Sequence, residues 1–408
     1  MRKRRIFCLL LICLLLFCAA TASADTELTA TEGINVPAIS GLKKFDIPDN
    51  EAMAFIKDMK AGWVLGNTFD AYSGEKRSNK GTVEMEKSWV GVKTSRAVIA
   101  AVKEAGFNAI RIPVSWHNHV DEANQIDAAW LARVREVADW ALEEGMYVIV
   151  NVHHDNYKDF FYPDSEHYES SAAYLSSVWK QMAECFADCD EHLILESMNE
   201  PRLAGTEYEW NWQSSQAVCR DAADCINRLN QLFVDTVRAS GGNNATRYLC
   251  VPAYDASPYN ACDDAFQMPK DTADNRIIIE AHAYTPYNFA LNTNSPDTKF
   301  NLTDTNKKSE ISQFMNRLYE KFVSKGIPVV IDEYGALEKK NNLQDRVNFA
   351  AYYVASASTR NITCFWWDNH VFQGNGERFG ILNRRNATWT YPDIVLAILQ
   401  NCLYNRGD

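Results

Sequence analysis

The sequence of 408 residues lacks a second long apolar run: one extends from Ile6 to Ala20, and none of similar length follows it. A transmembrane helix needs about 20 consecutive apolar residues, so we expect no membrane span after the N-terminal segment. Positive charge is also scarce. Residues 1–24 contain 4 of the 41 Lys and Arg and none of the 53 Asp and Glu, which leaves 37 against 53, a net charge of −16. So acidic a protein is a poor candidate for binding nucleic acid or an anionic membrane surface.

Several patterns that mark other protein classes are missing too. There is no Cys-x-x-Cys pair, no Gly-rich phosphate-binding fingerprint, and no linker, repeat or low-complexity stretch. We therefore expect one domain, no metal and no cofactor. The pair His117 and His119 has metal-ligand spacing, but no carboxylates or thiols cluster around it, which favours a substrate-side or structural role. Buried thiols, or one or two disulfides, are expected from eight cysteines: Cys185, Cys189, Cys219, Cys225, Cys250, Cys262, Cys364 and Cys402.

The N-terminus has the three parts of a secretory signal peptide. A basic head, Arg2 to Arg5, precedes the apolar run, and the small residues Ala22-Ser23-Ala24 follow it. We expect a signal peptide over residues 1–24, cleavage after Ala24 and a secreted protein. The alternatives are a membrane anchor, a twin-arginine signal and a lipoprotein signal through Cys18.

After a polar lead-in over residues 25–50, short apolar runs alternate with stretches of helical period. Near-continuous Val, Ile and Leu is typical of parallel strands that are buried on both faces. Eight such runs, with helical stretches between them and only the fifth lacking a clear long helix after it, predict an α/β fold, a (β/α)8 TIM barrel over residues 51–408. A doubly wound open sheet is the alternative. The expected strands are residues 62–70, 108–116, 147–155, 193–201, 247–254, 276–284, 328–335 and 363–369.

Polar side chains gather where these predicted strands end, which is where the site of such a barrel is built. An unpaired buried charge is costly, so seven of eight strands ending in ionisable or amide groups indicate a function rather than a structural role. Two of these groups are carboxylic acids, Glu200 and Glu333. Two carboxylates are the minimum for hydrolysing a glycosidic bond, since one protonates the leaving oxygen and the other attacks the sugar or activates water.

Seven segments give a more specific indication. In this order, GWVLGNTFDA, RIPVSW, NVHHD, MNEP, AHAY, IDEYG and WWDN resemble the retaining endo-glucanases of glycoside hydrolase family 5, and GNTFDA with the double histidine resembles its subfamily 4. The resemblance covers roughly residues 55–400. It implies that Glu200 is the general acid/base and Glu333 the nucleophile. The other residues that it implies bind substrate or support the site: Asn67, Arg111, Trp116, His153, His154, Asn199, His282, Tyr284 and Trp367.

The chemistry of these residues suits such roles. Arg111 keeps the nucleophile ionised, and Glu333 is expected to raise the pKa of Glu200 so that this acid keeps its proton. Asn199 bonds the 2-hydroxyl of the sugar, Tyr284 donates to Glu333, and His282 bonds the acid/base or the substrate. Neighbouring strand residues point to opposite faces, and the family position favours Trp367 under the sugar, with Trp366 toward the helices.

Other polar residues near the strand ends have plainer interpretations. Glu196 lies deeper than Glu200, Glu280 is expected to be a buried structural partner, and Asp332 should point away from Glu333. Asn67 and Asp70 are either ligand contacts or scaffolding. Aromatic shelves for a polysaccharide are expected from residues in loops after strands: Trp116, Phe160, Phe161, Tyr162, Trp210, Trp212, Tyr287 and Phe289.

The sequence therefore predicts a secreted, monomeric, metal-independent endo-β-1,4-glucanase that hydrolyses internal bonds of cellulose or mixed-linkage β-glucan by retaining double displacement. Its partner is then a polysaccharide. The alternatives are a xyloglucan-specific endo-glucanase, a xylan or mannan hydrolase with the same catalytic set, a metal-dependent barrel hydrolase, and a non-catalytic carbohydrate-binding barrel protein.

Overall fold

The structure is a computed structural model that describes residues 28–74 and 82–403. The expected signal peptide and its cleavage point lie outside the described residues. Eight parallel strands pair in chain order, and β8 pairs back with β1, so the sheet is a closed barrel. This confirms the predicted (β/α)8 barrel and excludes the open sheet. The strands are β1 Gly62–Leu65, β2 Ala109–Ile112, β3 Tyr147–Val150, β4 Leu193–Glu196, β5 Leu249–Val251, β6 Ile277–His282, β7 Val329–Tyr334 and β8 Thr363–Asp368.

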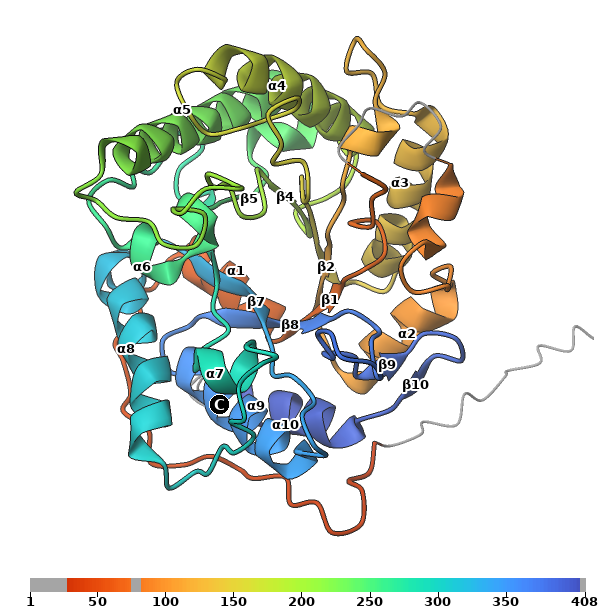
Figure 1. The fold of residues 1–408 in the computed structure, drawn as a ribbon, viewed down its shortest axis with the longest axis vertical. Helices are drawn as coiled ribbons and strands as arrows, with labels where there is room; N and C mark the ends of the chain where they lie inside the picture. Colours follow the sequence, from red (N-terminus) through yellow and green to blue (C-terminus); the bar gives the residue numbers. More distant parts are fainter. Residues whose placement is uncertain (1–27, 75–81, 404–408) are drawn as a thin grey trace, which may run out of the picture.

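Helices surround these strands (Figure 1). As the sequence predicts, no long helix follows the fifth strand: the short 3-10 helix Tyr254–Ala256 and the four-residue α6 stand before β6. A short antiparallel pair, β9 Leu382–Asn383 and β10 Thr388–Trp389, follows β8. The helices are α1 Glu51–Met59, α2 Arg96–Ala105, α3 Ala128–Glu143, α4 Tyr168–Cys185, α5 Ala217–Ala239, α6 Pro258–Ala261, α7 Tyr287–Ala290, α8 Thr305–Lys321, α9 Leu343–Ser358 and α10 Pro392–Asn401.

Two apolar layers hold the barrel together. One lies inside it and contains Val64, Ile194 and Phe365, while the other lies between the strands and the helices and contains Trp63, Leu195 and Trp366. Consecutive strand residues thus alternate between the layers, and both layers are apolar. This explains why the sequence shows continuous rather than alternating apolar runs.

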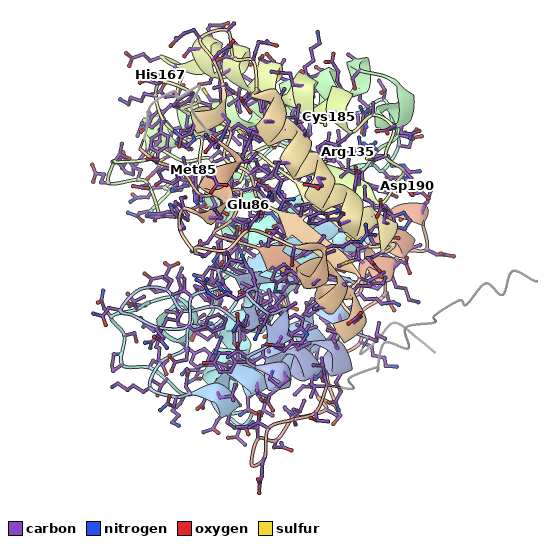
Figure 2. The ribbon with its side chains drawn as sticks, turned by 90° about the vertical axis from the view of Figure 1, so that its right-hand side faces the viewer. Met85, Glu86, Arg135, His167, Cys185 and Asp190 are labelled. Atoms are coloured by element: carbon purple, nitrogen blue, oxygen red, sulfur yellow. The ribbon has the colours of Figure 1, made fainter. Side chains whose placement is uncertain are left out.

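Polar contacts fix the outer parts of the ring. On α3, Arg135 donates to the carbonyl of Cys185 at the end of α4 (both residues are labelled in Figure 2). Arg135 also forms an ion pair of 2.7 Å with Asp188. Arg133, also on α3, donates two bonds of 2.9 Å to the fully buried Glu86. Because Glu86 belongs to the short 3-10 helix Val83–Lys87, this pair anchors the segment between β1 and α2.

The lead-in packs along the outside of the last helices. Thr31 bonds Asp393 on α10 through its backbone N–H, at 2.7 Å, and its hydroxyl, at 2.8 Å. Further along, the backbone carbonyl of Asp46 accepts the hydroxyl of Tyr319 on α8. The described part of the lead-in is therefore fastened to the barrel domain.

All eight cysteines outside the N-terminal segment are free thiols, and six of them are buried. Of the two outcomes that the sequence left open, buried thiols or disulfides, the structure has the thiols. Within residues 28–74 and 82–403, no helix combines the length and apolarity that crossing a bilayer requires.

We predict that Gly62→Ala destabilises the protein, because Gly62 on β1 lies directly against the aromatic ring of Phe365 inside the barrel. A Cβ at Gly62 comes within 2.1 Å of the Phe365 ring, which is fully buried. Overpacking of this kind lowers the free energy of unfolding by about 1–3 kcal/mol. Gly376→Ala, whose Cβ meets no atom within 4 Å, is the control and should change it by under about 0.5 kcal/mol. Urea unfolding of both variants measures the difference, and equal stabilities contradict the prediction.

Candidate active site

A buried arginine lies at the centre of the polar groups inside the barrel. Arg111, on β2, is fully buried and donates to Glu196 from Nε at 2.7 Å and from Nη2 at 2.6 Å. It also donates to Glu333 Oε1 at 2.6 Å and to Asn199 Oδ1 at 2.8 Å. Burial disfavours the charge, but Glu196, Asp332 and Glu333 outweigh it and raise the pKa of Arg111. One permanent cation thus orients residues from β4 and β7.

Glu333, on β7, receives a proton donor at each oxygen. Arg111 bonds Oε1, and the hydroxyl of Tyr284 donates to Oε2 at 2.9 Å. Burial and the Glu333 charge raise the pKa of Tyr284, so the phenol keeps its proton and remains a donor. Donors of this kind favour the charged form of a carboxylate. Glu333 is therefore held in one orientation at the end of its strand.

A β-bulge aims Glu333 into the barrel. His282 on β6 pairs with Glu333, and Trp366 on β8 pairs with Tyr334. Three residues of β7, Asp332 to Tyr334, therefore lie opposite two residues of each neighbouring strand. One extra residue of this kind re-aims a side chain. Asp332 and Glu333 consequently both face inward, and both contact Arg111, at 3.4 and 2.6 Å. The prediction that Asp332 points away from Glu333 is wrong, because simple strand parity does not hold across the bulge.

Glu200 lies four residues beyond β4, on the chain that leaves the sheet at the barrel mouth. His282 Nδ1, from β6, is 2.7 Å from its Oε1, and Arg202 Nη1 is 3.7 Å from its Oε2. The two catalytic candidates are close together, since Glu200, His282 and Glu333 each place one atom within 4.8 Å of the others. Carboxyl groups about 5–5.5 Å apart are characteristic of retaining glycosidases.

The direction of the Glu200 pKa differs from the sequence-based expectation. Burial raises it, but the hydrogen bond and charge of His282, together with Arg202, lower it to about 2. Burial lowers the pKa of His282, but Glu333 and Glu200 raise it to about 9. Expecting Glu333 to dominate was wrong because the imidazole, not the second carboxylate, touches Glu200. His282 and Glu200 therefore titrate as a pair that shares one proton.

Two histidines and a tryptophan form a neutral wall beside the carboxylates. Trp367 belongs to the inner layer and lies over Gly66, while its ring is parallel to that of His153 at 5.9 Å. Trp366 belongs to the outer layer. Burial lowers the pKa of His153 well below its usual range and that of His154 to about 4. The wall therefore adds aromatic surface and hydrogen-bonding nitrogens to the site without adding charge.

Asn67 and Trp116, two of the expected site residues, are held by contacts within the protein itself. Asp70 accepts the backbone N–H groups of Asn67, at 2.9 Å, and Thr68, at 2.6 Å, and so fixes the turn after β1, where Asn67 has a φ of 56°. Trp116 is fully buried and donates to the carbonyl of Asn151 at 2.9 Å. Trp116 therefore supports the scaffold and cannot be a shelf for substrate.

The loop aromatics divide into two groups. Phe160, Phe161, Tyr162 and Phe289 are at most 4 % exposed, so predicting them as shelves was wrong. Phe160 packs on Tyr174 of α4, and Phe289, which belongs to α7, packs on Phe349 of α9; periodicity cannot report these contacts. Trp210 and Tyr287 are 60 % and 59 % exposed, and Trp89 is 41 % exposed. Sequence reasoning missed Arg202, which stacks on Trp210 at 4.0 Å and directly follows the Asn-Glu-Pro tripeptide, a signal that could have identified it.

Donor atoms in the site also have metal-ligand spacing, in Glu200, His282 and Glu333. Each of these carboxylates already accepts from a protein donor, namely His282 for Glu200, and Arg111 and Tyr284 for Glu333. The set is thus satisfied by its neighbours and needs no ion to balance it. A metal-independent site remains a prediction.

Residues 72–373 match the family model described as cellulase, glycosyl hydrolase family 5. Endoglucanase B of Neocallimastix patriciarum is 40 % identical over 348 residues, which are 85 % of this chain and 70 % of that protein. Endoglucanase 1 of Ruminococcus albus is 38 % identical over 380 residues, 92 % of this chain and 88 % of that one.

Solved structures are similar over most of the chain. A family 5 lichenase from Caldicellulosiruptor sp. F32 is 50 % identical with a TM-score of 0.88, covering 90 % of this chain and 100 % of that one, and a mutant of it was solved with cellotetraose. A broad-specificity GH5-4 endoglucanase from Ruminococcus champanellensis, with cellotriose, is 41 % identical with a TM-score of 0.79, covering 87 % and 100 %. A xyloglucan-specific endo-β-1,4-glucanase from a metagenomic library is 38 % identical with a TM-score of 0.77, covering 85 % and 98 %.

The shared proton gives a direct prediction for His282. Replacing Glu200 by Gln removes the carboxylate that faces Nδ1, so the pKa of His282 should fall from about 9. NMR titration of the ring measures the change, with the resonance assigned by its loss in His282→Gln. Glu104→Gln, an exposed position on α2, is the matched control and should leave the pKa of His282 unchanged. An unchanged pKa in Glu200→Gln contradicts the pairing.

Proposed function

Because the chain belongs to glycosyl hydrolase family 5, the cellulase family, we propose that it hydrolyses internal β-1,4 bonds of β-glucans with retention of configuration through Glu333 and Glu200. One observation supports this mechanism most strongly. Two carboxylates place oxygens within 4.8 Å of each other, one bonded by Arg111 and Tyr284 and the other by a protonated histidine. An ionised nucleophile and a proton source thus stand side by side.

In the first step the Glu333 carboxylate attacks the anomeric carbon as the glycosidic C–O bond breaks. The leaving oxygen takes the proton that Glu200 shares with His282, so the first product departs as an alcohol and a glycosyl ester remains. The Arg111 guanidinium at 2.6 Å and the Tyr284 hydroxyl at 2.9 Å keep Glu333 oriented for attack. Residues that only position Glu333 therefore contribute to the rate.

In the second step Glu200, now a carboxylate, takes a proton from water, and the water oxygen attacks the anomeric carbon of the ester. The bond to Glu333 breaks, and the second inversion restores the β configuration. His282 beside Glu200 accepts the proton back at 2.7 Å. The pair returns to its initial state with one proton.

Asn199 and Trp367 are the residues that bind the sugar. The Asn199 oxygen is engaged by Arg111 at 2.8 Å, so its side-chain NH₂ is the group left for the 2-hydroxyl. Trp367, in the inner layer beside His153, is the ring that we expect to pack on sugar C–H groups. Among the exposed aromatics, Trp210 and Tyr287 are suited to more distant sugars of the polysaccharide.

The location of the protein follows from its first residues. The tripartite pattern over residues 1–24 supports export with cleavage after Ala24, a lead-in over residues 25–50 and a catalytic domain over residues 51–408. The mature protein then acts outside the cell, and we propose that it does so as a monomer.

Removing either carboxylate should lower kcat/KM on barley β-glucan by about 10³-fold or more, because each acts in the transition state. Azide should distinguish the roles on an aryl β-glycoside. It restores turnover of Glu200→Ala with a β-glycosyl azide and of Glu333→Ala with an α-glycosyl azide. Proton NMR of the first sugar released by wild type should show the β anomer. Near-normal turnover in either variant, or an α product, contradicts the assignment.

A substrate panel tests the polysaccharide class. We expect the greatest release of reducing ends from mixed-linkage β-glucan and carboxymethyl cellulose, since a lichenase is 50 % identical over 90 % of the chain. Xyloglucan is the second candidate, because of the xyloglucan-specific enzyme that is 38 % identical. Mannan and xylan complete the panel. Binding to β-glucan without hydrolysis of any of the five would instead support a carbohydrate-binding barrel.

A further inference from the structure

Beneath the catalytic carboxylates lies a second acidic cluster inside the barrel. It consists of Glu196 on β4, Glu280 on β6 and Asp332 on β7, all fully buried. One carboxylate oxygen of each lies within 4.8 Å of the other two. Three bare negative charges at this spacing in a dry interior would be very unfavourable, so their protons and partners must be accounted for.

Glu196 is fully provided with donors. It accepts two bonds from Arg111, at 2.6 and 2.7 Å, and one from Asn151 Nδ2 at 2.7 Å. Both oxygens of Glu196 therefore have donors within the protein. Glu196 and Arg111 form the ion pair around which the rest of the cluster is arranged.

Glu280 and Asp332 are different. None of their four carboxylate oxygens accepts a hydrogen bond from a donor in the described protein, although all four are buried. Instead, one oxygen of each lies within 4.8 Å of an oxygen of the other. A carboxylate can only accept, so a bond between two carboxyl groups requires a proton on one of them.

We propose that Glu280 carries this proton and donates it to an ionised Asp332, and that Asp332 is a positioning residue for His282. Asp332 is the charged member because cations face it: Arg111 Nε is 3.4 Å and His282 Nε2 is 3.6 Å away. Glu280 has no ion pair within 4 Å among the described residues. The catalytic consequence of this inference rests on the proposed function.

The pKa values of the two carboxyl groups are ordered as this geometry requires, with that of Glu280 above that of Asp332. Burial and the charges of Glu196 and Asp332 raise the pKa of Glu280 well above its usual range. Burial raises the pKa of Asp332 to about 7, with Arg111 opposing it. The titratable groups that face the pair are Arg111 from β2, Glu196 from β4, Cys250 from β5, His282 from β6 and Glu333 from β7.

The ionised Asp332 acts on the catalytic acid through the imidazole. His282 lies between the two carboxylates, with Nε2 toward Asp332 at 3.6 Å and Nδ1 toward Glu200 at 2.7 Å. A negative charge at Asp332 favours a proton on Nε2, which leaves Nδ1 to exchange the other proton with Glu200. Removal of this charge makes the imidazolium easier to deprotonate.

Two isosteric variants test the proposal, because an amide imitates a protonated carboxyl but not an ionised one. Glu280→Gln should keep the alkaline limb of the kcat/KM profile on β-glucan where wild type has it, because the amide N–H still donates to Asp332. Asp332→Asn removes the charge facing His282, so that limb should move by about one unit to lower pH. Equal shifts in the two variants overturn the assignment, and so does a Glu280→Gln protein that does not fold.

A measurement without substrate separates this inference from the proposed function. The infrared spectrum of wild type near pH 7 should contain the C=O stretch of a protonated carboxyl, shifted in heavy water and absent from Glu280→Gln. Subtracting the two spectra removes the contribution of other buried acids such as Asp70 and Asp255, whose pKa values burial raises to about 7. If this difference band is missing, Glu280 does not carry the proposed proton, whether or not the protein hydrolyses β-glucan.

Stability against pH gives a second readout of the same proton. A carboxyl whose pKa is raised by folding stabilises the native state below its unfolded pKa, near 4.3, and loses that contribution as the pH rises through the folded pKa. Glu280→Gln should therefore gain stability relative to wild type as the pH rises from about 5 to about 8. Glu104→Gln, the exposed control, should follow wild type throughout. A pH-independent difference for Glu280→Gln contradicts the proposal.

Discussion

The arrangement of the site depends on one buried cation. Arg111 reaches Glu196, Glu333 and Asn199 from a position with no access to solvent. A guanidinium can do this because its donors form a rigid planar fork and it does not lose its charge. Leaving buried carboxylates without such a partner would cost several kcal/mol. The ion pair with Glu196 therefore fixes the guanidinium, and the guanidinium in turn fixes the nucleophile.

The sequence predicts the barrel well because its signal is repeated. Each of eight apolar runs must be buried on both faces, and only a few architectures bury eight parallel strands in this way. Strand ends are less well predicted. The run 193–201 looks like one strand, yet β4 ends at Glu196, and Asn199 and Glu200 lie on the chain beyond it. A pattern of apolar residues indicates which part of the chain is buried, but it does not indicate at which residue the backbone pairing of a strand ends.

The sequence predicts which residues form the site better than it predicts how these residues are arranged. Polar residues at strand ends identified Arg111, Glu200, His282 and Glu333, which the structure brings together. Three features escaped prediction, each for a tertiary reason. The bulge in β7 reverses the parity of Glu333, Trp116 is buried against the carbonyl of Asn151, and the pKa of Glu200 follows a contact with His282 that no spacing reveals.

Charge balance links the catalytic groups to the cluster below them. Three cations, Arg111, His282 and Arg202, face the carboxyl groups of Glu196, Glu200, Glu280, Asp332 and Glu333. The neighbouring histidines cannot help, because burial keeps His153 and His154 neutral. If every carboxyl were ionised, the excess negative charge would hold the proton of His282 more tightly and oppose its transfer through Glu200. A neutral Glu280, which lies beside Glu196 and Asp332, reduces that excess by one charge. The proton on Glu280, inside the barrel, therefore affects how readily His282 and Glu200 transfer their proton at the barrel mouth.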